Sequence, residues 1–232
     1  MIRKRIRSYP KQYGGSVKSW RNALSGTPAF LIGNAPSLSD IDLSLIKNQF
    51  SIGINRVFPP YVDYEPTILM WQDPELWYGE KHRVTKIKSI KYCRTKADVS
   101  GQCFHFKLTI GSFKLPECAS VLHGQGSTGP LAFQLAYLLG CDPIVLLGMD
   151  CCYKDGKTDY YGVNYHHRPH TLKNCKKGLH WISTCKSKRT IINCSNNDVF
   201  PEKEDLGETV KRVDLKKAQT QDSLIKRIIS KS

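Results

Sequence analysis

Six short apolar segments, separated by turn and helix signals, constrain most strongly what this chain can fold into. Each spans five or six residues, which is the length of a β-strand rather than of a helix. They are residues 28–33, 50–55, 67–71, 87–92, 143–148 and 190–194. The first three and the fifth are apolar at most positions, as is typical of parallel strands that are covered on both faces. The sequence therefore predicts a largely parallel sheet.

Helical patterns fall between these segments. The clearest covers residues 128–140, with a hydroxyl residue at its start, Pro130 in its first turn and Gly140 at its end. These start and stop signals stand in the order expected for a helix. Further helices are predicted from Ser39 or Asp40 to Lys47 and over residues 74–80, 172–186 and 224–229. Strands that alternate with helices predict an α/β fold, here a single doubly wound Rossmann-like domain with a mostly parallel sheet.

Three segments stand apart from this alternation. Residues 1–24 are a basic leader with seven positive charges and no acidic residue. Residues 149–171 are polar, aromatic and rich in histidine with no periodic pattern, which predicts a lid-like segment near the site. Residues 201–232 are a charged C-terminal extension that we expect to be helical. Residues 25–200 then form the nucleotide-binding domain.

In doubly wound sheets, ligands bind beyond the carboxyl ends of the strands, where the strand order reverses. The polar residues of this chain gather at such positions. They are residues 33–37, Asn55, Gln72, Asp73, residues 127–129 and residues 150–170. This concentration predicts an enzyme site.

The turn at residues 33–38 places Gly33 where a strand must bend tightly into a helix. Backbone N–H groups at a helix start bind phosphate, and Asn34 and Ser37 add side-chain hydrogen bonds. The turn lacks the glycines of a dinucleotide fingerprint and the lysine of a P-loop. A plain strand–helix turn fits these residues equally well.

Ser127, Thr128 and Gly129 open the clearest helix and follow Gly126. Hydroxyl groups and glycines at the positive end of a helix dipole suit a phosphate or a carboxylate. An ordinary helix cap needs only one of the two hydroxyls. The paired glycines favour an anion site over a bare cap.

Three histidines lie within five residues at His166, His167 and His170. A neutral histidine suits proton abstraction from a hydroxyl group, and nearby tyrosines can donate hydrogen bonds to a leaving phosphate. A solvated loop or an adventitious metal site explains the same residues. The segment is nevertheless the least ordinary stretch of the chain.

The net charge of +15 predicts attraction to anions such as nucleotides, acidic sugars, nucleic acid or an acidic membrane face. A solvated basic surface without a partner explains the charge equally well. The nine cysteines are odd in number and contain no Cys-x-x-Cys pair, which argues against a disulfide framework. Cys151 and Cys152 precede the histidines without the paired spacing of a zinc site, so we expect buried free thiols.

No segment reaches the ~20 apolar residues of a membrane span, and no apolar core follows the basic N-terminus as in a secretory signal. The expected location is therefore cytoplasmic. The basic patches of the chain would also suit a peripheral position at the inner face of a membrane.

Taken in order, these motifs resemble the bacterial sialyltransferases of glycosyltransferase family 42. They also resemble a wider superfamily that includes 6-hydroxymethylpterin diphosphokinase-like proteins. The resemblance runs from about Phe30 to Cys194. It rests on residues 33–38, 54–56, 72–74, 127–129, 148–150 and 160–170.

The resemblance implies roles for residues of the lid-like segment. His170, in the pattern His166-x-x-x-His170-Thr171, would be the general base on the acceptor hydroxyl, with His167 as the nearest rival. Tyr153 and either Tyr160 or Tyr161 would hold the departing phosphate. Relative to the family, one extra residue lies between these tyrosines, and a Cys-Cys pair replaces part of the pattern.

The resemblance also implies a donor site. Asn34 and Asn55 match asparagines that line it, whereas Asp73 stands where the family often has asparagine. Ser127, Thr128 and Gly129 would meet the nucleotide or carboxylate of the donor. The predicted donor site is completed by Gly33, Ser37, Asp150 and Tyr160.

The predicted function is a metal-independent transfer of a sugar, sialic acid foremost, from a CMP-linked donor to an anionic or glycan acceptor, with no cofactor. One alternative is a diphosphokinase that uses ATP and magnesium, with Asp73 and Asp150 holding the metal. If Asp150 is not a metal ligand, it could simply cap or hydrogen-bond the lid. The other alternative is a protein that binds or modifies nucleic acid, which the basic leader and the seven positive charges of residues 81–97 favour. No nucleic-acid recognition motif supports it.

Overall fold

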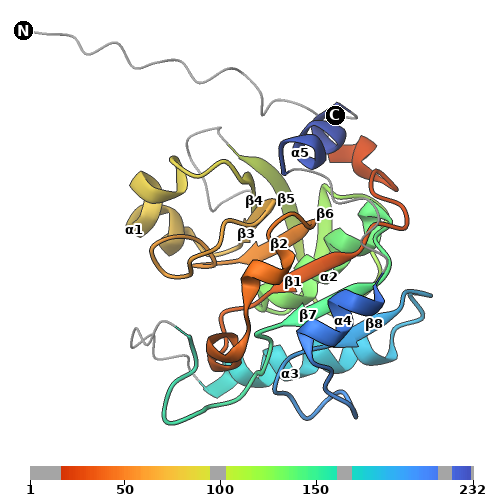
Figure 1. Ribbon diagram of the computed structural model, residues 1–232. Helices are drawn as coiled ribbons and strands as arrows, with labels where there is room; N and C mark the ends of the chain where they lie inside the picture. The colour runs from red at the N-terminus through yellow and green to blue at the C-terminus, as the bar shows by residue number, and fades with distance from the viewer. Residues whose placement is uncertain (1–16, 95–102, 161–168, 214–220, 231–232) are drawn as a thin grey trace, which may run out of the picture.

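The computed structural model describes residues 17–94, 103–160, 169–213 and 221–230. Eight strands form one sheet in the order β6-β5-β4-β3-β2-β1-β7-β8, and all neighbouring strands pair in parallel. The strands are β1 Ala29–Ile32, β2 Ser51–Ile54, β3 Ile68–Trp71, β4 Ile90–Arg94, β5 Phe104–Ile110, β6 Val121–Gly124, β7 Ile144–Leu147 and β8 Ile191–Asn193. The predicted α/β fold with a parallel sheet is confirmed (Figure 1).

The strand order shows where the direction of winding changes. From β1 the chain adds strands in one direction out to β6, then returns to place β7 and β8 on the opposite side of β1. The order therefore reverses between β1 and β7. In open α/β sheets this is the position at which a ligand crevice forms.

All six predicted strands are present, with ends shifted by no more than three residues. Two strands, β5 and β6, were not predicted. In β5 exposed Lys107 interrupts the apolar pattern, and the strand is increasingly exposed toward its end. Strand β6 has only four residues and contains buried His123. The Gln134 amide accepts a hydrogen bond from the backbone N–H of His123 (2.9 Å) and donates one to its carbonyl (2.6 Å).

The helices are α1 Pro74–Val84, α2 Thr128–Leu139, α3 Pro169–Thr184, α4 Leu206–Arg212 and α5 Gln221–Ile229, with short 3-10 helices η1 Val17–Trp20, η2 Pro36–Asp40 and η3 Leu43–Ile46. The helix predicted up to Lys47 is wrong. The backbone is extended at Ile41 and Asp42, and the Asp42 carboxylate accepts a hydrogen bond from the Ser44 N–H, which starts a separate turn. Helix α3 begins three residues earlier than predicted, so the end of the predicted lid is helical.

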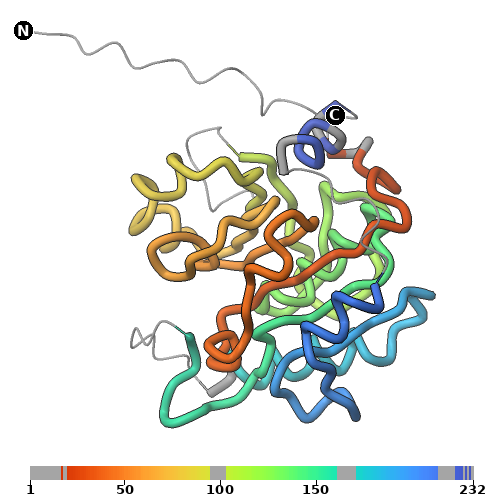
Figure 2. The backbone as a smooth tube through the Cα atoms, viewed as in Figure 1, coloured from red at the N-terminus to blue at the C-terminus, as the bar shows by residue number. Residues whose placement is uncertain are grey.

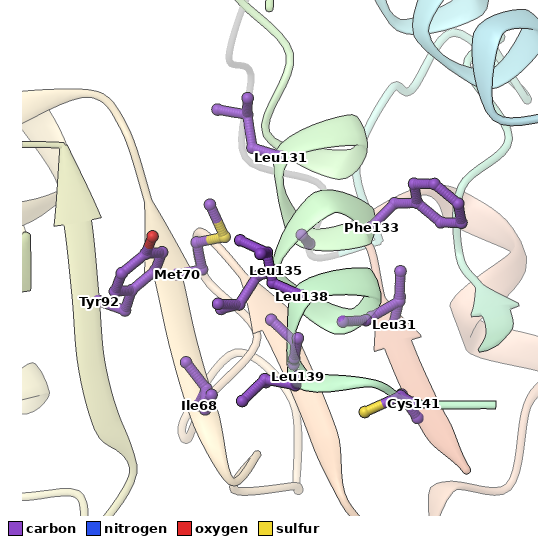
Figure 3. Close-up of a cluster of buried hydrophobic side chains, with 14 of the residues drawn as sticks. Leu31, Ile68, Met70, Tyr92, Leu131, Phe133, Leu135, Leu138, Leu139 and Cys141 are labelled. Atoms are coloured by element: carbon purple, nitrogen blue, oxygen red, sulfur yellow. The ribbon is translucent and has the colours of Figure 1, made fainter. Parts of the chain in front are cut away.

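Helix α2 is the centre of the larger core. Its leucines point at the sheet and pack against Leu31, Ile68, Met70 and Tyr92 of three strands (Figure 3). Only Tyr137 of its twelve residues is not fully buried. Because α2 is apolar on every side, it needs cover from a second helix, and α3 supplies that cover.

Alternate residues of the central strands face opposite cores. In β1, Leu31 belongs to the core around α2, whereas Phe30 and Ile32 belong to a second core with residues of η3 and α4. Residues of β7 alternate in the same way. Cover on both faces explains why these strands are apolar at every position.

Both ends of the described chain join the core around α2. Val17, Trp20 and Leu24 are buried there, as are Leu224 and Ile228 of α5. The end of the predicted basic leader thus contributes apolar side chains to the core. The predicted domain boundaries stay predictions. Among the described helices, none has the length and hydropathy to cross a membrane.

Candidate functional site

An open pocket with about 770 Å³ of empty space lies at the carboxyl ends of the central strands. Its walls come from the turns after β1, β2, β3 and β7, from the first turn of α2 and from the start of α3. The lining residues are Asn34, Ala35, Ile54, Asn55, Gln72, Asp73, Gly126, Ser127, Thr128, Gly129, Pro130, Gly148, Met149, Asp150, Cys151, Cys152, Thr158, Asp159, Thr171, Leu172, Cys175 and Leu179. The pocket is open to solvent and lies where the order of the strands reverses.

Two glycines make the close contact at the reversal of strand order. Gly33 donates a hydrogen bond to the carbonyl of Leu147 (2.7 Å), and Ala35 donates one to the carbonyl of Gly148 (3.0 Å). A Cβ atom at Gly33 would lie 2.1 Å from the Gly148 oxygen, and Gly148 itself has a φ of +59°. Glycine is therefore required at both positions to bring β1 and β7 together below the pocket.

Asn34 and Asn55, which the sequence predicts in the donor site, both line the pocket. The carbonyl of Asn34 accepts a hydrogen bond of 2.6 Å from the backbone of Tyr160, which ties the segment after β7 to the turn after β1. Asn55 has a φ of +54°, in the left-handed region that non-glycine residues seldom adopt. Strained backbone at a pocket wall is a frequent property of functional sites.

A charged network centred on buried Glu80 begins at the residue after Asn55. The next residue, Arg56, places its Nε 3.7 Å from Oε1 of Glu80, and Arg83 donates a hydrogen bond of 2.7 Å to Oε2. Tyr61 donates its hydroxyl hydrogen to the same carboxylate. Burial opposes ionisation, but the hydrogen bonds and the positive charges outweigh it, so the pKa of Glu80 is lowered. The network fixes the turn that holds Asn55.

The first turn of α2 forms another wall. The Ser127 side chain does not cap the helix but donates a hydrogen bond to the sulfur of Cys175 at 3.4 Å. The Thr128 hydroxyl accepts one from buried Gln72 at 3.1 Å, which joins α2 to the end of β3. The first N–H groups of α2 have no partner within the helix, and the Ser127 side chain gives them no cap.

Asp150 lines the pocket but is only 3% exposed. Its carboxylate accepts hydrogen bonds from the backbone and the hydroxyl of Ser37, and from the backbone of Asn196 (3.0 Å). Ser37, which does not line the pocket, thus supports the site through Asp150. The carboxylate thus braces the turn after β1 and the segment after β8, rather than the rest of the lid-like segment.

Asp150→Asn is expected to destabilise the fold by about 2 kcal/mol, because an amide turns one acceptor into a donor that faces an N–H or O–H group. Asp155→Asn is the matched control. Asp155 is exposed, and we expect no measurable loss there. Urea denaturation of both variants checks this. Equal midpoints would contradict the bracing role.

The remaining predicted residues lie outside the pocket lining or outside the described residues. Tyr153 and Tyr160 are 54% and 37% exposed and do not line the pocket. Tyr161 and His167 lie outside the described residues. His170 lies in the first turn of α3, directly before Thr171, which lines the pocket. The roles of these residues stay predictions.

Seven predicted donor residues line one pocket, namely Asn34, Asn55, Asp73, Ser127, Thr128, Gly129 and Asp150. Several lining residues had no predicted role. Thr158 and buried Asp159 come from the lid-like segment, where no pattern distinguishes inward from outward residues. Cys175 was assigned to an amphipathic helix without a role. Its position one turn after Thr171 was the sequence signal that could have assigned it to the pocket.

Within the described ranges, no group of three or more His, Cys, Asp or Glu side chains is placed to hold a metal ion.

No family model and no curated protein matches the sequence. Among solved structures, the MAf glycosyltransferase of Magnetospirillum magneticum AMB-1 is similar, with a TM-score of 0.56 and 14% identity over 95% of this chain and 41% of that chain. The chain thus spans about two fifths of the length of that protein, and the likeness shows a shared fold.

Two sialyltransferases of Campylobacter jejuni are more distant. CstII, solved with cytidine-5'-monophosphate, has a TM-score of 0.46 and 16% identity over 73% of this chain and 80% of that chain. The α-2,3-sialyltransferase Cst-I has a TM-score of 0.46 and 12% identity over 72% and 75%.

Proposed function

We propose that the chain is a glycosyltransferase that moves a sugar, sialic acid foremost, from a CMP-linked donor to an acceptor hydroxyl without a metal. The observation that carries the proposal is the convergence of Asn34, Asn55 and the first turn of α2 on one pocket at the reversal of strand order. The fold shared with a glycosyltransferase is consistent with it. The CMP-linked sialic acid follows from the resemblance of the sequence motifs to family 42.

In this proposal the first turn of α2 receives the nucleotide phosphate. Helix α2 is twelve residues long, and Ser127, Thr128 and Gly129 at its start line the pocket. Backbone N–H groups and the helix dipole stabilise negative charge at that end. Charge that develops on the leaving phosphate is stabilised there, and such hydrogen bonds contribute roughly 3 kcal/mol each.

His170 is proposed as the base that takes the proton from the acceptor hydroxyl. It directly precedes Thr171, which lines the pocket, in the first turn of α3. The oxocarbenium-like centre left by the departing phosphate needs a positioned nucleophile and a base more than it needs covalent help. Tyr153 and Tyr160 or Tyr161 remain the proposed donors to the leaving phosphate.

The acceptor is proposed to be an anionic glycan. Lys173, Lys177 and His180 are exposed and recur at helical spacing along α3, which starts at the pocket. Such a row attracts an acidic chain that reaches into the pocket. Nucleic acid or an anionic membrane would meet the same charges. Nucleic acid would be favoured instead if the logarithm of the binding constant for duplex DNA fell as the logarithm of the salt concentration rose, with a slope near −0.9 for each phosphate contact.

The diphosphokinase alternative needs Asp150 as a magnesium ligand. Its carboxylate already accepts hydrogen bonds from Ser37 and Asn196, so metal binding would break this brace. Asp73 and Asp159 also line the pocket, but the described residues hold no group of three or more His, Cys, Asp or Glu side chains placed to bind a metal, and two carboxylates are a sparse ligand set for magnesium. The geometry therefore favours the transferase.

Gly129→Ala tests whether the start of α2 binds the phosphate. A Cβ atom there would meet the Met149 sulfur at 3.6 Å, an ordinary contact, and alanine favours a helix. The fold is therefore expected to keep its stability. The added methyl group blocks close approach to the backbone, and we expect CMP to bind at least about tenfold more weakly, or ~1.4 kcal/mol.

Titration calorimetry with CMP on the original chain and on Gly129→Ala measures this difference. Gly79→Ala is the matched control and should bind CMP like the original chain, because Gly79 is at an exposed position of α1 and the new Cβ would have nothing within 4 Å. Equal affinity in all three would show that the phosphate lies elsewhere.

A further inference from the structure

One buried carboxylate connects helix α1 to the turn after β2. Glu80 of α1 is 6% exposed, and its Oε1 lies 3.7 Å from Nε of Arg56, a side chain that is itself only 11% exposed. Arg56 directly follows Asn55, which lines the pocket. Figures 1 and 2 show the two segments side by side, the turn in orange and the helix in yellow. An ion pair to α1 is thus made one residue away from the pocket wall.

Tyr61 adds two kinds of contact to this ion pair. Its hydroxyl donates a hydrogen bond to the Glu80 carboxylate. The guanidinium carbons of Arg56 and Arg83 lie 5.6 and 5.8 Å from the centre of its ring, which is the range of cation–π contacts. Arg83 also donates a hydrogen bond of 2.7 Å to Glu80. A buried ion pair is favourable only when further hydrogen bonds satisfy it, and these contacts supply them.

The two ends of the ion pair differ in how they are held. Helix α1 is packed firmly, because Trp77, one turn before Glu80, is 2% exposed and its ring stacks on that of Trp71 in β3, with 6.2 Å between the ring centres. The turn after β2 contains the left-handed backbone of Asn55, with a φ of +54°. Such a backbone persists only where its surroundings hold it. The bond from Arg56 to Glu80 joins this strained turn to a fixed helix.

We propose that Glu80 is a positioning residue for the donor: through Arg56, it holds Asn55 in the orientation that binds the nucleotide-linked sugar. This inference rests on the proposed function, in which Asn55 belongs to the donor site. Neither Arg56 nor Glu80 lines the pocket, so their effect on a ligand passes through Asn55. Small displacements at such a position are costly, because a shift of about 1 Å can lower a rate about a hundredfold.

Titration calorimetry with CMP on Glu80→Gln tests the proposal. The substitution removes the charge that holds Arg56 and keeps the size of the side chain. We expect CMP to bind at least about tenfold more weakly than to the original chain, because the support of Asn55 is lost. Tyr61→Phe removes only one hydrogen bond of the network and should weaken CMP binding about threefold. This milder variant gives the same test if Glu80→Gln does not fold.

Tyr64→Phe is the matched control, because it makes the same chemical change three residues after Tyr61. The buried Tyr64 hydroxyl donates a hydrogen bond of 2.9 Å to the hydroxyl of Ser51 at the start of β2, and Tyr64 does not line the pocket. We expect a lower urea midpoint and unchanged CMP affinity. If Tyr64→Phe weakened CMP binding as much as Tyr61→Phe, lost stability rather than position would explain both, and the proposal would be overturned.

A double-mutant cycle shows whether Glu80 acts through Asn55. Asn55→Gly removes the amide and suits the left-handed backbone, and we expect it to weaken CMP binding about tenfold. In that background Glu80→Gln should lower the affinity by no more than about twofold further, because the group that it positions is absent. A second tenfold loss would overturn the route through Asn55. Circular dichroism shows whether each variant is folded.

The original chain separates failure of this inference from failure of the proposed function. If the original chain does not bind CMP, the proposed function fails, and this role of Glu80 fails with it. If the original chain binds CMP and the folded Glu80→Gln variant binds it equally well, only the positioning role is overturned.

Discussion

Gly33→Ala is expected to lose about 3 kcal/mol of stability or more, the upper end of the usual cost of overpacking. The new Cβ atom would lie 2.1 Å from the Gly148 carbonyl oxygen and 3.1 Å from the Met149 side chain. A backbone oxygen cannot rotate away as a side chain can. Relief requires β1 and β7 to separate, and this would break the hydrogen bonds from Gly33 to Leu147 and from Ala35 to Gly148.

Gly79→Ala makes the same chemical change with the opposite expected sign. Gly79 lies inside α1, and its Cβ atom would have nothing within 4 Å. Alanine in an exposed helix interior stabilises by roughly 0.5–1 kcal/mol relative to glycine. Urea denaturation should therefore move the midpoint down for Gly33→Ala and slightly up for Gly79→Ala. A Gly33→Ala midpoint equal to that of the original chain would contradict the close contact at the reversal of strand order.

His170→Ala is expected to reduce sugar transfer by roughly 10²–10⁴-fold, the usual contribution of a general base. The fold and CMP affinity should be unchanged, because the proposed role of His170 concerns the acceptor proton and not the nucleotide. Release of CMP from CMP-sialic acid in the presence of glycan acceptors measures the transfer. Circular dichroism and CMP titration of the same variant separate lost chemistry from lost binding.

Two other histidines are the controls for this experiment. His180 lies on the same helix and is exposed, so His180→Ala should not lower turnover at saturating acceptor. His167→Ala tests the rival assignment. Full activity in His170→Ala together with a large loss in His167→Ala would transfer the role of base to His167. Full activity in both would remove His167 and His170 from the reaction.

The central part of the fold was predictable because its signals are local. The strands from Ala29 to Ile32 and from Ile144 to Leu147 are buried on both faces, so each shows as a short apolar run. Helix α2 carries Pro130 and Gly140 at its ends, and Gly140 adopts the left-handed conformation that ends the helix, with a φ of +82°. Such signals do not depend on the rest of the structure.

Elements that rely on distant partners were not predictable. His123 fits in β6 only because Gln134, eleven residues later, satisfies its backbone. Sequence patterns cannot reveal this pairing. The extended residues Ile41 and Asp42 divide one predicted helix into η2 and η3 for a different, local reason, because the Asp42 carboxylate accepts a hydrogen bond from Ser44 two residues later. A side chain that bonds to nearby backbone competes with the helix there.

The residues of the candidate site also divide into those that local sequence signals predict and those that depend on contacts between distant parts of the chain. Asn34, Asn55 and Asp73 were predictable because each follows a strand, and the carboxyl ends of parallel strands meet at one edge of the sheet. The bracing of Asp150 by Ser37 joins residues 113 positions apart, and the hydrogen bond from Ser127 to the Cys175 sulfur joins residues 48 positions apart. Only the folded chain reveals those contacts.

Thermal unfolding of the original chain with CMP, with or without magnesium, tests most directly whether this pocket is a metal-independent CMP site. A ligand at a hundred times its dissociation constant stabilises by about 2.7 kcal/mol, which corresponds to roughly 5–10 °C for a chain of this size. The proposed function predicts such a shift with CMP, equal in magnesium and in a chelator, and none with ATP. A shift that appears only with ATP and magnesium would contradict it and favour the diphosphokinase.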